Sequence, residues 1–470
     1  MKQILLKCKA ITPMFSRGLV PEEGENFFSF ELRPQSIKGV LRFWLRAIIP
    51  LVIDPKFYNY EEFEETKDQK KYWRSQEYAG MKKLEEIIMG SQHQKSSFSL
   101  QVNFPKSINP IGEYYRNKNN RLRLSYNQDF GTNKFNSRYA IYGTYDIKIP
   151  GSYDKYVYSF LPEGTEFEIT LSILKKYYSQ ELEDLLIKLF GLVSMFSGFG
   201  AKTKKGFGEF EVINSKECTR VNPDENTINE AKEALKAFIE AKYSQYFKKS
   251  ENYNDLSFPS FASYELIDLS ALCPSLIDSS PKLVLSKLYQ NYFDKDYNIK
   301  YLGWYPMLKW NLRMFPLEGK SKDLVSDLKE MIKGNKEQTK LTTGILGLPL
   351  QYQQIRIGTK YDKSVPITGK ITFSPLVFGE QNNKGRKASP IHISIHKKID
   401  SGKFYPVVLL LKSKISEGKL YWSSSTNRDR EYEPKHGEAE VFNDFEILRK
   451  LIMQTCTDFC EKYKRGENGA

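Results

Sequence analysis

The glycine-rich run SGFGAKTKKGFGEF, residues 197–210, constrains the fold more than any other part of this chain. Apolar residues recur at three- and four-residue steps over 182–196, which predicts a helix before the run. Alternating apolar residues predict a strand before that helix, at 167–173, and another after the run, at 207–213. The order strand, helix, glycine run, strand is the organisation expected of an α+β domain.

Glycine beside lysine is typical of loops that hold phosphate, but the spacing here does not fit the nucleotide-binding loops. A Walker loop needs a second glycine five residues after the first, and Thr203 and Lys205 occupy those positions after Gly198 and Gly200. Thr203 also breaks the dinucleotide pattern G-x-G-x-x-G. The run leads from a helix into a strand, so it offers no helix N-terminus to an anion. We therefore expect no nucleotide cofactor.

Two interpretations of the run remain open. In the first, bare backbone N–H groups and three lysines neutralise the backbone of a polynucleotide. In the second, one of the first two glycines only caps the helix, and one of the last two forms a bulge or a close backbone contact. The residues concerned are Gly198, Gly200, Lys202, Lys204, Lys205, Gly206 and Gly208.

A second basic feature lies in ELRPQSIKGVLRFWLRAIIP, residues 31–50. Ser36 is expected to cap a helix that Pro50 ends. On that helix Lys38, Arg42 and Arg46 share one face, opposite an apolar arc that would pack on a sheet. This basic stripe is either a binding surface or an ordinary solvated face.

Composition favours a polyanionic partner. Lys and Arg number 71 against 57 Asp and Glu, a net charge of +14, and the chain holds 30 Tyr and 30 Phe. Cations beside aromatic rings suit single-stranded nucleic acid. The five cysteines include no CxxC pair, so we expect no structural zinc, and they suit a reducing cytoplasm. No apolar segment reaches the length of a membrane span.

The length predicts two domains, placed at residues 1–215 and 216–470, both mixing strands and helices. A polar stretch at 54–138 is interpreted as an insertion in the first domain, although it contains an expected helix at 78–89 and strand at 98–104. The second half ends with strands at 369–373, 391–396 and 405–411, followed by a helix at 442–463.

Three stretches resemble a known family. The glycine run is similar to the glycine-rich loop of the RAMP superfamily of CRISPR proteins, which follows the last helix of a ferredoxin-like fold and precedes its final strand. Residues 31–47 resemble the first-helix segment of the first-subunit family of type III-B (Cmr) effector complexes. RKASPIHISIH, residues 386–396, is similar to a motif in the second half of that family.

The resemblance implies two ferredoxin-like (RRM-like) RAMP domains in tandem, with the insertion in the first. It implies a non-catalytic, cytoplasmic subunit without cofactor or metal. Its expected partners are the other Cmr subunits and the 3′ region of the CRISPR RNA, with target RNA as a further candidate. By motif position the implied RNA-binding residues are Arg33, Lys38, Arg42, Arg46, Gly198, Gly200, Lys202, Lys204, Lys205, Gly206, Gly208, Arg386 and Lys387.

A catalytic alternative rests on His392 and His396, which lie on one face of the strand IHISIH. Such a pair could serve a metal-independent endoribonuclease as general acid and base. The simpler interpretation places both histidines on the exposed face of a half-buried strand. No metal-ligating or hydrolase motif accompanies them, and the resemblance implies binding without catalysis.

Overall fold

The structure of this chain is a computed structural model. It describes residues 1–470 except 20, 22–24, 62–65, 106–107, 132–139, 150–153, 215–222, 252–255, 291, 294–298, 316–323, 337–339, 342–345, 347–349, 360–365, 376–388, 414–418, 428–434, 442–443 and 468–470. Helices and several small, mostly antiparallel sheets alternate along the chain, an α+β architecture as predicted.

The chain forms two compact units. Unit 1 comprises Met1–Asn254, Ser260–Tyr301 and His392–Leu411, and unit 2 comprises Asp255–Pro259, Leu302–Ile391 and Lys412–Ala470. The predicted domains, 1–215 and 216–470, follow a different division, because segments after residue 216 complete unit 1. The tandem of two RAMP domains therefore stays a prediction.

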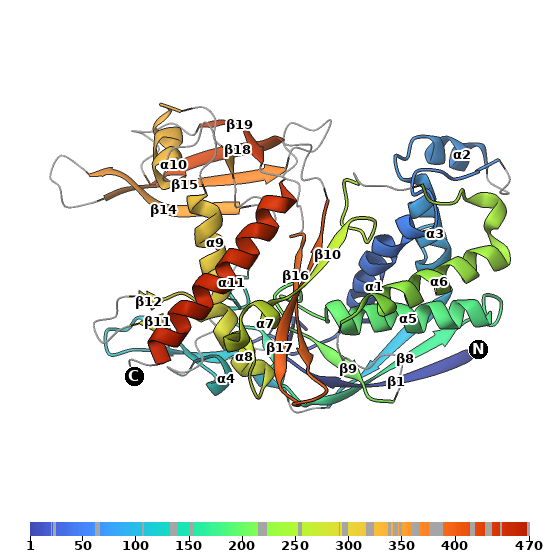
Figure 1. Cartoon of the computed structure of the whole chain (residues 1–470), viewed down its shortest axis with the longest axis horizontal. Helices are drawn as coiled ribbons and strands as arrows, with labels where there is room; N and C mark the ends of the chain where they lie inside the picture. The colour runs from blue at the N-terminus through green and yellow to red at the C-terminus, as the bar shows by residue number, and fades with distance from the viewer. Residues whose placement is uncertain are drawn as a thin grey trace. The chain divides into compact units, whose positions relative to one another are not determined.

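The main sheet of unit 1 has the order β3–β8–β1–β9, and every neighbouring pair is antiparallel. Its strands are β1 (Lys2–Ala10), β3 (Phe98–Asn103), β8 (Glu166–Ile173) and β9 (Phe210–Val212). Two helices, α1 (Pro34–Ile48) and α5 (Gln180–Phe196), follow β1 and β8 in the sequence and pack against each other (Figure 1). Along the chain these elements succeed one another as β, α, β, β, α, β.

The two helices form where their apolar residues predict them. The apolar face of α1 includes Leu41, Trp44 and Ile48, all fully buried. This helix begins at Pro34, earlier than the expected cap at Ser36, because proline fits the first turn, where no backbone donor is needed. Ser179 caps α5 by accepting a hydrogen bond from the backbone N–H of Leu182.

The predicted insertion at 54–138 is not one continuous addition, because β3 lies within it and is an edge strand of the main sheet. Only one face of β3 is apolar, so its sequence is nearly as polar as its surroundings. The other elements of this stretch are α2 (Lys67–Arg74), α3 (Ala79–Met89), β4 (Asn109–Pro110), β5 (Gly112–Arg116), β6 (Leu122–Tyr126) and α4 (Gln128–Gly131).

Unit 1 also contains a sheet of order β2–β7–β4 and one of order β10–β17–β16. Helix α6 packs on α5, above the main sheet (Figure 1). These and the remaining elements of unit 1 are β2 (Met14–Ser16), η1 (Ile49–Leu51), β7 (Ser159–Leu161), α6 (Glu225–Lys242), η3 (Ser244–Tyr246), β10 (Tyr264–Asp268), α7 (Leu269–Leu272), η4 (Pro274–Leu276), α8 (Pro281–Tyr289), β11 (Tyr292–Phe293), β12 (Ile299–Tyr301), β16 (Ile391–Lys397) and β17 (Phe404–Leu411).

Unit 2 combines a five-stranded sheet of order β13–β19–β18–β15–β14 with helices. Helix α10 packs on this sheet, and α9 packs along α11. The buried indole of Trp304 on α9 donates a hydrogen bond to the Cys456 sulfur on α11, at 3.2 Å. The bounds are α9 (Trp304–Met314), α10 (Leu324–Lys333), β13 (Lys340–Leu341), β14 (Leu350–Thr359), β15 (Pro366–Pro375), β18 (Lys419–Thr426), β19 (His436–Val441) and α11 (Phe445–Glu467).

Candidate nucleic-acid interface

The glycine run forms a loop whose backbone is packed tightly against other backbone. The N–H of Phe199 donates to the carbonyl oxygen of Gly208 at 2.9 Å, and the N–H of Gly208 donates to that of Pro13 at 2.9 Å. A Cβ on Gly198 or Gly208 would lie closer than 3.0 Å to backbone atoms of the facing strand of the loop. These glycines are therefore needed for a close backbone contact, as the second interpretation of the run expected.

Gly200 and Gly206 serve the loop through their backbone angles. Their φ values are +88° and +77°, in the left-handed region that favours glycine. A Cβ on Gly200 would also collide with the carbonyl oxygen of Phe15. The glycines are therefore explained by packing and backbone conformation. The side chains of the three lysines take no part in these contacts.

The three loop lysines lie at the surface of the loop and are half-buried. Lys204 places its Nζ 5.0 Å from the ring centroid of Phe43 on α1, and Lys205 donates to the carbonyl oxygen of Ala140 at 3.4 Å. Burial lowers the pKa of Lys202, and no ion pair involves this lysine within the described residues. Lys202 therefore carries a partly desolvated positive charge that an anion would stabilise.

The loop also joins the main sheet to β16. The N–H of Ile393 donates to the carbonyl oxygen of Lys204 at 3.1 Å. The buried carboxylate of Glu209 accepts from the N–H of Ile395, with both oxygens within 3.1 Å. Sequence reasoning missed Glu209, although an acidic residue directly after the last glycine, within an apolar run, was a signal for a buried acceptor.

Two of the three cations of the basic stripe on α1, Arg42 and Arg46, share one carboxylate. Arg46 forms a bidentate ion pair with Glu85 of α3, and Arg42 contacts the same carboxylate at 3.2 Å. Arg42 also donates to the carbonyl oxygens of Met89 and Gly90, at the C-terminal end of α3. The side chain of Glu85 is only 7% exposed, so this pairing holds α3 against α1. Sequence reasoning missed Glu85, which lies 43 residues from Arg42.

The other two predicted residues around α1 also have internal partners. Lys38 donates to the carbonyl oxygen of Phe98 at 3.0 Å, and its Nζ lies 4.7 Å from the centroid of that ring. Burial, and then the charge of Arg42, lower the pKa of Lys38. Arg33 forms an exposed ion pair with Glu31 at 2.9 Å. The predicted Arg386 and Lys387 lie outside the described residues.

His392 and His396 are buried, at 1% and 0% exposure, so the prediction of an exposed histidine face is wrong. Strand β16 is buried on both faces, and the ring of Phe43 stacks on that of His392, with centroids 5.3 Å apart. Lys205 of the glycine loop forms a β-bridge with Ile393 along the edge of this strand. Burial, and then the charge of Lys204, hold the pKa of His392 well below its usual range. The imidazole of His392 is therefore neutral at physiological pH and withdrawn from solvent. His396 contacts the Ser394 hydroxyl at 2.8 Å.

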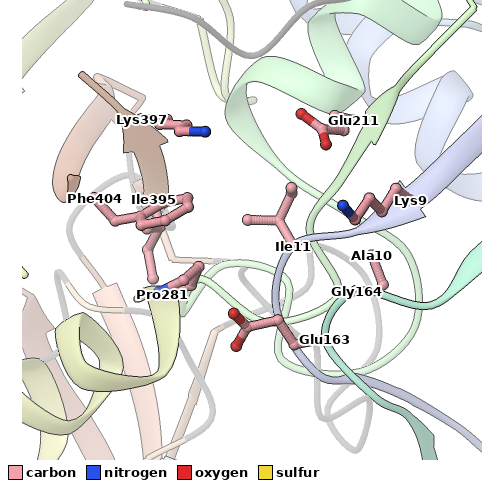
Figure 2. A pocket seen from close by; sticks show the side chains of 10 residues that line it. All are labelled: Lys9, Ala10, Ile11, Glu163, Gly164, Glu211, Pro281, Ile395, Lys397 and Phe404. Carbon is pink, nitrogen blue, oxygen red and sulfur yellow. The ribbon is translucent and has the colours of Figure 1, made fainter. Parts of the chain in front are cut away.

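A cavity of about 210 Å³ lies between β1, β9, β16 and α8 within unit 1. Lys9 and Lys397 extend toward it from opposite walls, and Glu163 and Glu211 also line it (Figure 2). Two cations and two carboxylates give this cavity no preference for a polyanion. It is therefore a weaker candidate for RNA than the glycine loop.

Within the described residues, no group of three or more His, Cys, Asp or Glu side chains is arranged to hold a metal ion. No helix in the same part of the chain is long and apolar enough to cross a membrane.

Comparisons with known proteins confirm the predicted resemblance. Residues 7–211, which include α1, α5 and the glycine loop, match the sequence model of the RAMP superfamily. The chain is 22% identical over 298 residues to the CRISPR system Cmr subunit Cmr1-1 of Pyrococcus furiosus. That alignment covers 63% of this chain and 73% of the relative.

Two solved structures show a distant likeness to the whole chain. One is the crystal structure of apo Cmr1 from Pyrococcus furiosus, with 15% identity and a TM-score of 0.40, covering 87% of this chain and 88% of that one. The other belongs to the type III-B Cmr-beta complex bound to cognate target RNA and AMPPnP, with 12% identity and a TM-score of 0.43. It covers 96% of this chain and 98% of that one.

Proposed function

We propose that this chain, a RAMP-type CRISPR protein that resembles the first Cmr subunit, is an RNA-binding subunit of a type III-B CRISPR effector complex. Its RNA would be the 3′ region of the CRISPR RNA, with target RNA as a second candidate. Its protein partners would be the other Cmr subunits, in the cytoplasm, where its cysteines would stay reduced. The RAMP match over residues 7–211 and the Cmr1-1 relative support this proposal.

We propose further that the first half has the ferredoxin-like fold of RAMP domains. The succession β, α, β, β, α, β and the antiparallel order β3–β8–β1–β9 support it. The second half would be a second ferredoxin-like domain, of which β10, β16 and β17 supply three strands. This arrangement places the glycine loop between the last helix and last strand of the first domain.

The observation that carries RNA binding is the state of Lys202. This lysine is half-buried, its pKa is lowered by desolvation, and within the described residues it has no acidic partner. A phosphate group beside it would favour the charged form and offset that desolvation. Lys204 and Lys205 lie in the same loop, so a phosphate backbone passing Lys202 would meet further positive charge. Arg33 is the other proposed phosphate contact, because its ion pair with Glu31 is exposed to solvent and therefore weak.

The test is a salt titration of RNA affinity with the full chain. If Lys202, Lys204, Lys205 and Arg33 each neutralise one phosphate of single-stranded RNA, log affinity should fall with a slope of about −3 in log salt. Replacing the three lysines by glutamine should bring that slope to about −1. The matched control replaces Lys232 and Lys236 on α6, which are surface cations outside the loop, and should leave the slope unchanged. A salt-independent affinity would contradict the proposal.

We propose no catalytic activity for the chain. The burial of His392 and His396 argues against their use as general acid and base, because neither ring can reach an RNA backbone in this conformation. Incubation of the full chain with guide-repeat RNA in EDTA tests the alternative. Cleavage that disappears in the His392→Ala variant would replace the binding role by a metal-independent endoribonuclease.

A further inference from the structure

Four tyrosines gather beside the glycine loop, on β5, on β6 and in the segment 140–146. The Tyr145 ring lies between those of Tyr126 and Tyr142, with centroids 5.6 Å and 6.0 Å away, and both pairs are edge-to-face. The Tyr114 hydroxyl donates to the Asp146 carboxylate at 2.9 Å and accepts from the Asp146 N–H at 2.8 Å. Tyr142 is 66% exposed, so the cluster ends in a ring that is open to solvent.

The loop lysines reach the same segment. The Nζ of Lys202 lies 3.7 Å from the position that a Cβ on Gly143 would occupy, directly after Tyr142. Lys205 donates to the carbonyl oxygen of Ala140. A cation therefore stands next to the backbone of the segment that carries the exposed ring, and cations near aromatic rings are the combination that binds a base and its phosphate together.

The backbone of Lys202 is held in an unusual conformation. Its φ is +68°, and among described residues other than glycine only Asn120 and Asp146 also have positive φ. Asn and Asp adopt this region at low cost through their short polar side chains, whereas it is strained for lysine. Strained residues cluster at functional sites, because the surrounding structure must enforce them. In this backbone conformation, the Nζ of Lys202 lies beside Gly143 in the tyrosine segment.

Charge complementarity identifies the partner class. The hairpin β5–β6 that carries Tyr114 and Tyr126 exposes four cations against the single carboxylate of Glu113. These cations are Arg116, Lys118, Arg121 and Arg123. A peptide partner would need acidic residues to match them, whereas every nucleotide of an RNA brings its own phosphate. Bases stack on tyrosine faces whatever their sequence.

We propose that Tyr142 and Tyr145, with Lys202, form a stacking site for unpaired bases of single-stranded RNA, continuous with the glycine loop. This inference rests on the proposed RNA binding and adds a recognition mode to it. The glycine loop would position phosphates, and the tyrosines would hold the bases that follow.

The experiment uses the full chain and a single-stranded RNA of about twelve nucleotides that contains one 2-aminopurine. Tyr142→Ala should weaken affinity about tenfold and abolish the quenching of 2-aminopurine by stacking. Tyr142→Phe keeps the ring and should retain both. The matched control is Tyr115→Ala, because Tyr115 is also exposed, at 52%, but lies on the face of the β5–β6 hairpin opposite to Tyr114 and Tyr126. It should bind like the wild type.

The outcomes separate this inference from the proposed function. If the wild-type chain does not bind the RNA at all, the proposed function fails and the stacking site fails with it. If the wild type binds but Tyr142→Ala binds equally well, or Tyr115→Ala loses as much affinity, the stacking site is overturned and RNA binding stands. If Tyr142→Ala leaves RNA binding intact and instead abolishes association with another Cmr subunit, the cluster is a protein-docking surface and the inference is also overturned.

Discussion

The basic stripe of α1 and the glycine loop were predicted to bind RNA on the same grounds of charge, yet the structure treats them differently. Arg42 and Arg46 share the buried carboxylate of Glu85, whereas burial lowers the pKa of Lys202 without a counter-charge among the described residues. A phosphate approaching the stripe must compete with Glu85, while one approaching the loop relieves an existing cost. The number of cations is therefore a poorer guide to a binding surface than the carboxylates that face them.

The largest expected difference between the two regions is the effect of a glycine-to-alanine substitution on the free energy of unfolding. Gly208 has a φ of +73°, and a Cβ there would lie closer than 3.0 Å to the carbonyl oxygen of Phe199, whereas a Cβ on Gly39 in α1 would meet nothing within 4 Å. We expect Gly208→Ala to lower the free energy of unfolding by about 3 kcal/mol. Gly39→Ala should raise it by about 1 kcal/mol. Urea unfolding of the full chain, followed by circular dichroism, measures both. Equal midpoints would show that the loop can relax.

The role of Glu85 gives the next largest effect. Glu85→Gln removes the carboxylate under two arginines and should lower the free energy of unfolding by about 2 to 3 kcal/mol, because it leaves a partly buried cationic pair. Glu113→Gln is the control, since Glu113 is exposed on β5, and should change stability by less than about 0.5 kcal/mol. If Glu85→Gln also raises RNA affinity, the stripe is a binding surface that Glu85 restrains. Unchanged stability would remove the structural role assigned to the stripe.

The sequence predicted elements better than contacts. Helix α5 and strand β8 followed from periodicity, because both bury an uninterrupted apolar face. Strand β3 was predicted as a strand but assigned to an insertion, because its alternating pattern does not show which sheet the strand joins. Glu85 could not be paired with Arg42 from spacing, since the contact joins two helices through tertiary packing. The histidines of β16 alternate as an exposed face would, and they are buried by tertiary contacts that include the rings of Phe43 and Trp44 on His392 and that of Tyr405 near His396.

His392 connects the two regions, because its ring stacks on Phe43 of α1 and its strand pairs with the loop. Its folded-state pKa lies well below 6.5, so the unfolded chain binds more protons as pH falls through 6.5. The associated stability is fully present above pH 6.5 and should decline by about 1 to 2 kcal/mol by pH 5. His392→Phe should remove this part of the pH dependence, whereas His93→Gln, in an exposed loop, should not. Urea unfolding midpoints at pH 7.5 and pH 5 measure this loss of stability. An equal loss in the wild type and in His392→Phe would contradict the role assigned to His392.

The smallest expected effect is on the pH dependence of RNA affinity, which distinguishes the charge of Lys202 in the loop from that of Arg42 in the stripe. The lowered pKa of Lys202 means that its ammonium deprotonates earlier than an ordinary lysine as pH rises. Only the protonated form attracts phosphate, so RNA affinity should be full below that pKa and fall by about threefold as pH rises through it, the worth of one phosphate contact. Lys202→Arg stays charged and should abolish the decline. Arg42→Lys in the stripe should leave the profile as in the wild type, because Arg42 faces Glu85 and the end of α3. If the pH dependence of RNA affinity changes in Arg42→Lys and stays as in the wild type in Lys202→Arg, the phosphate contact belongs to the stripe and not to the loop.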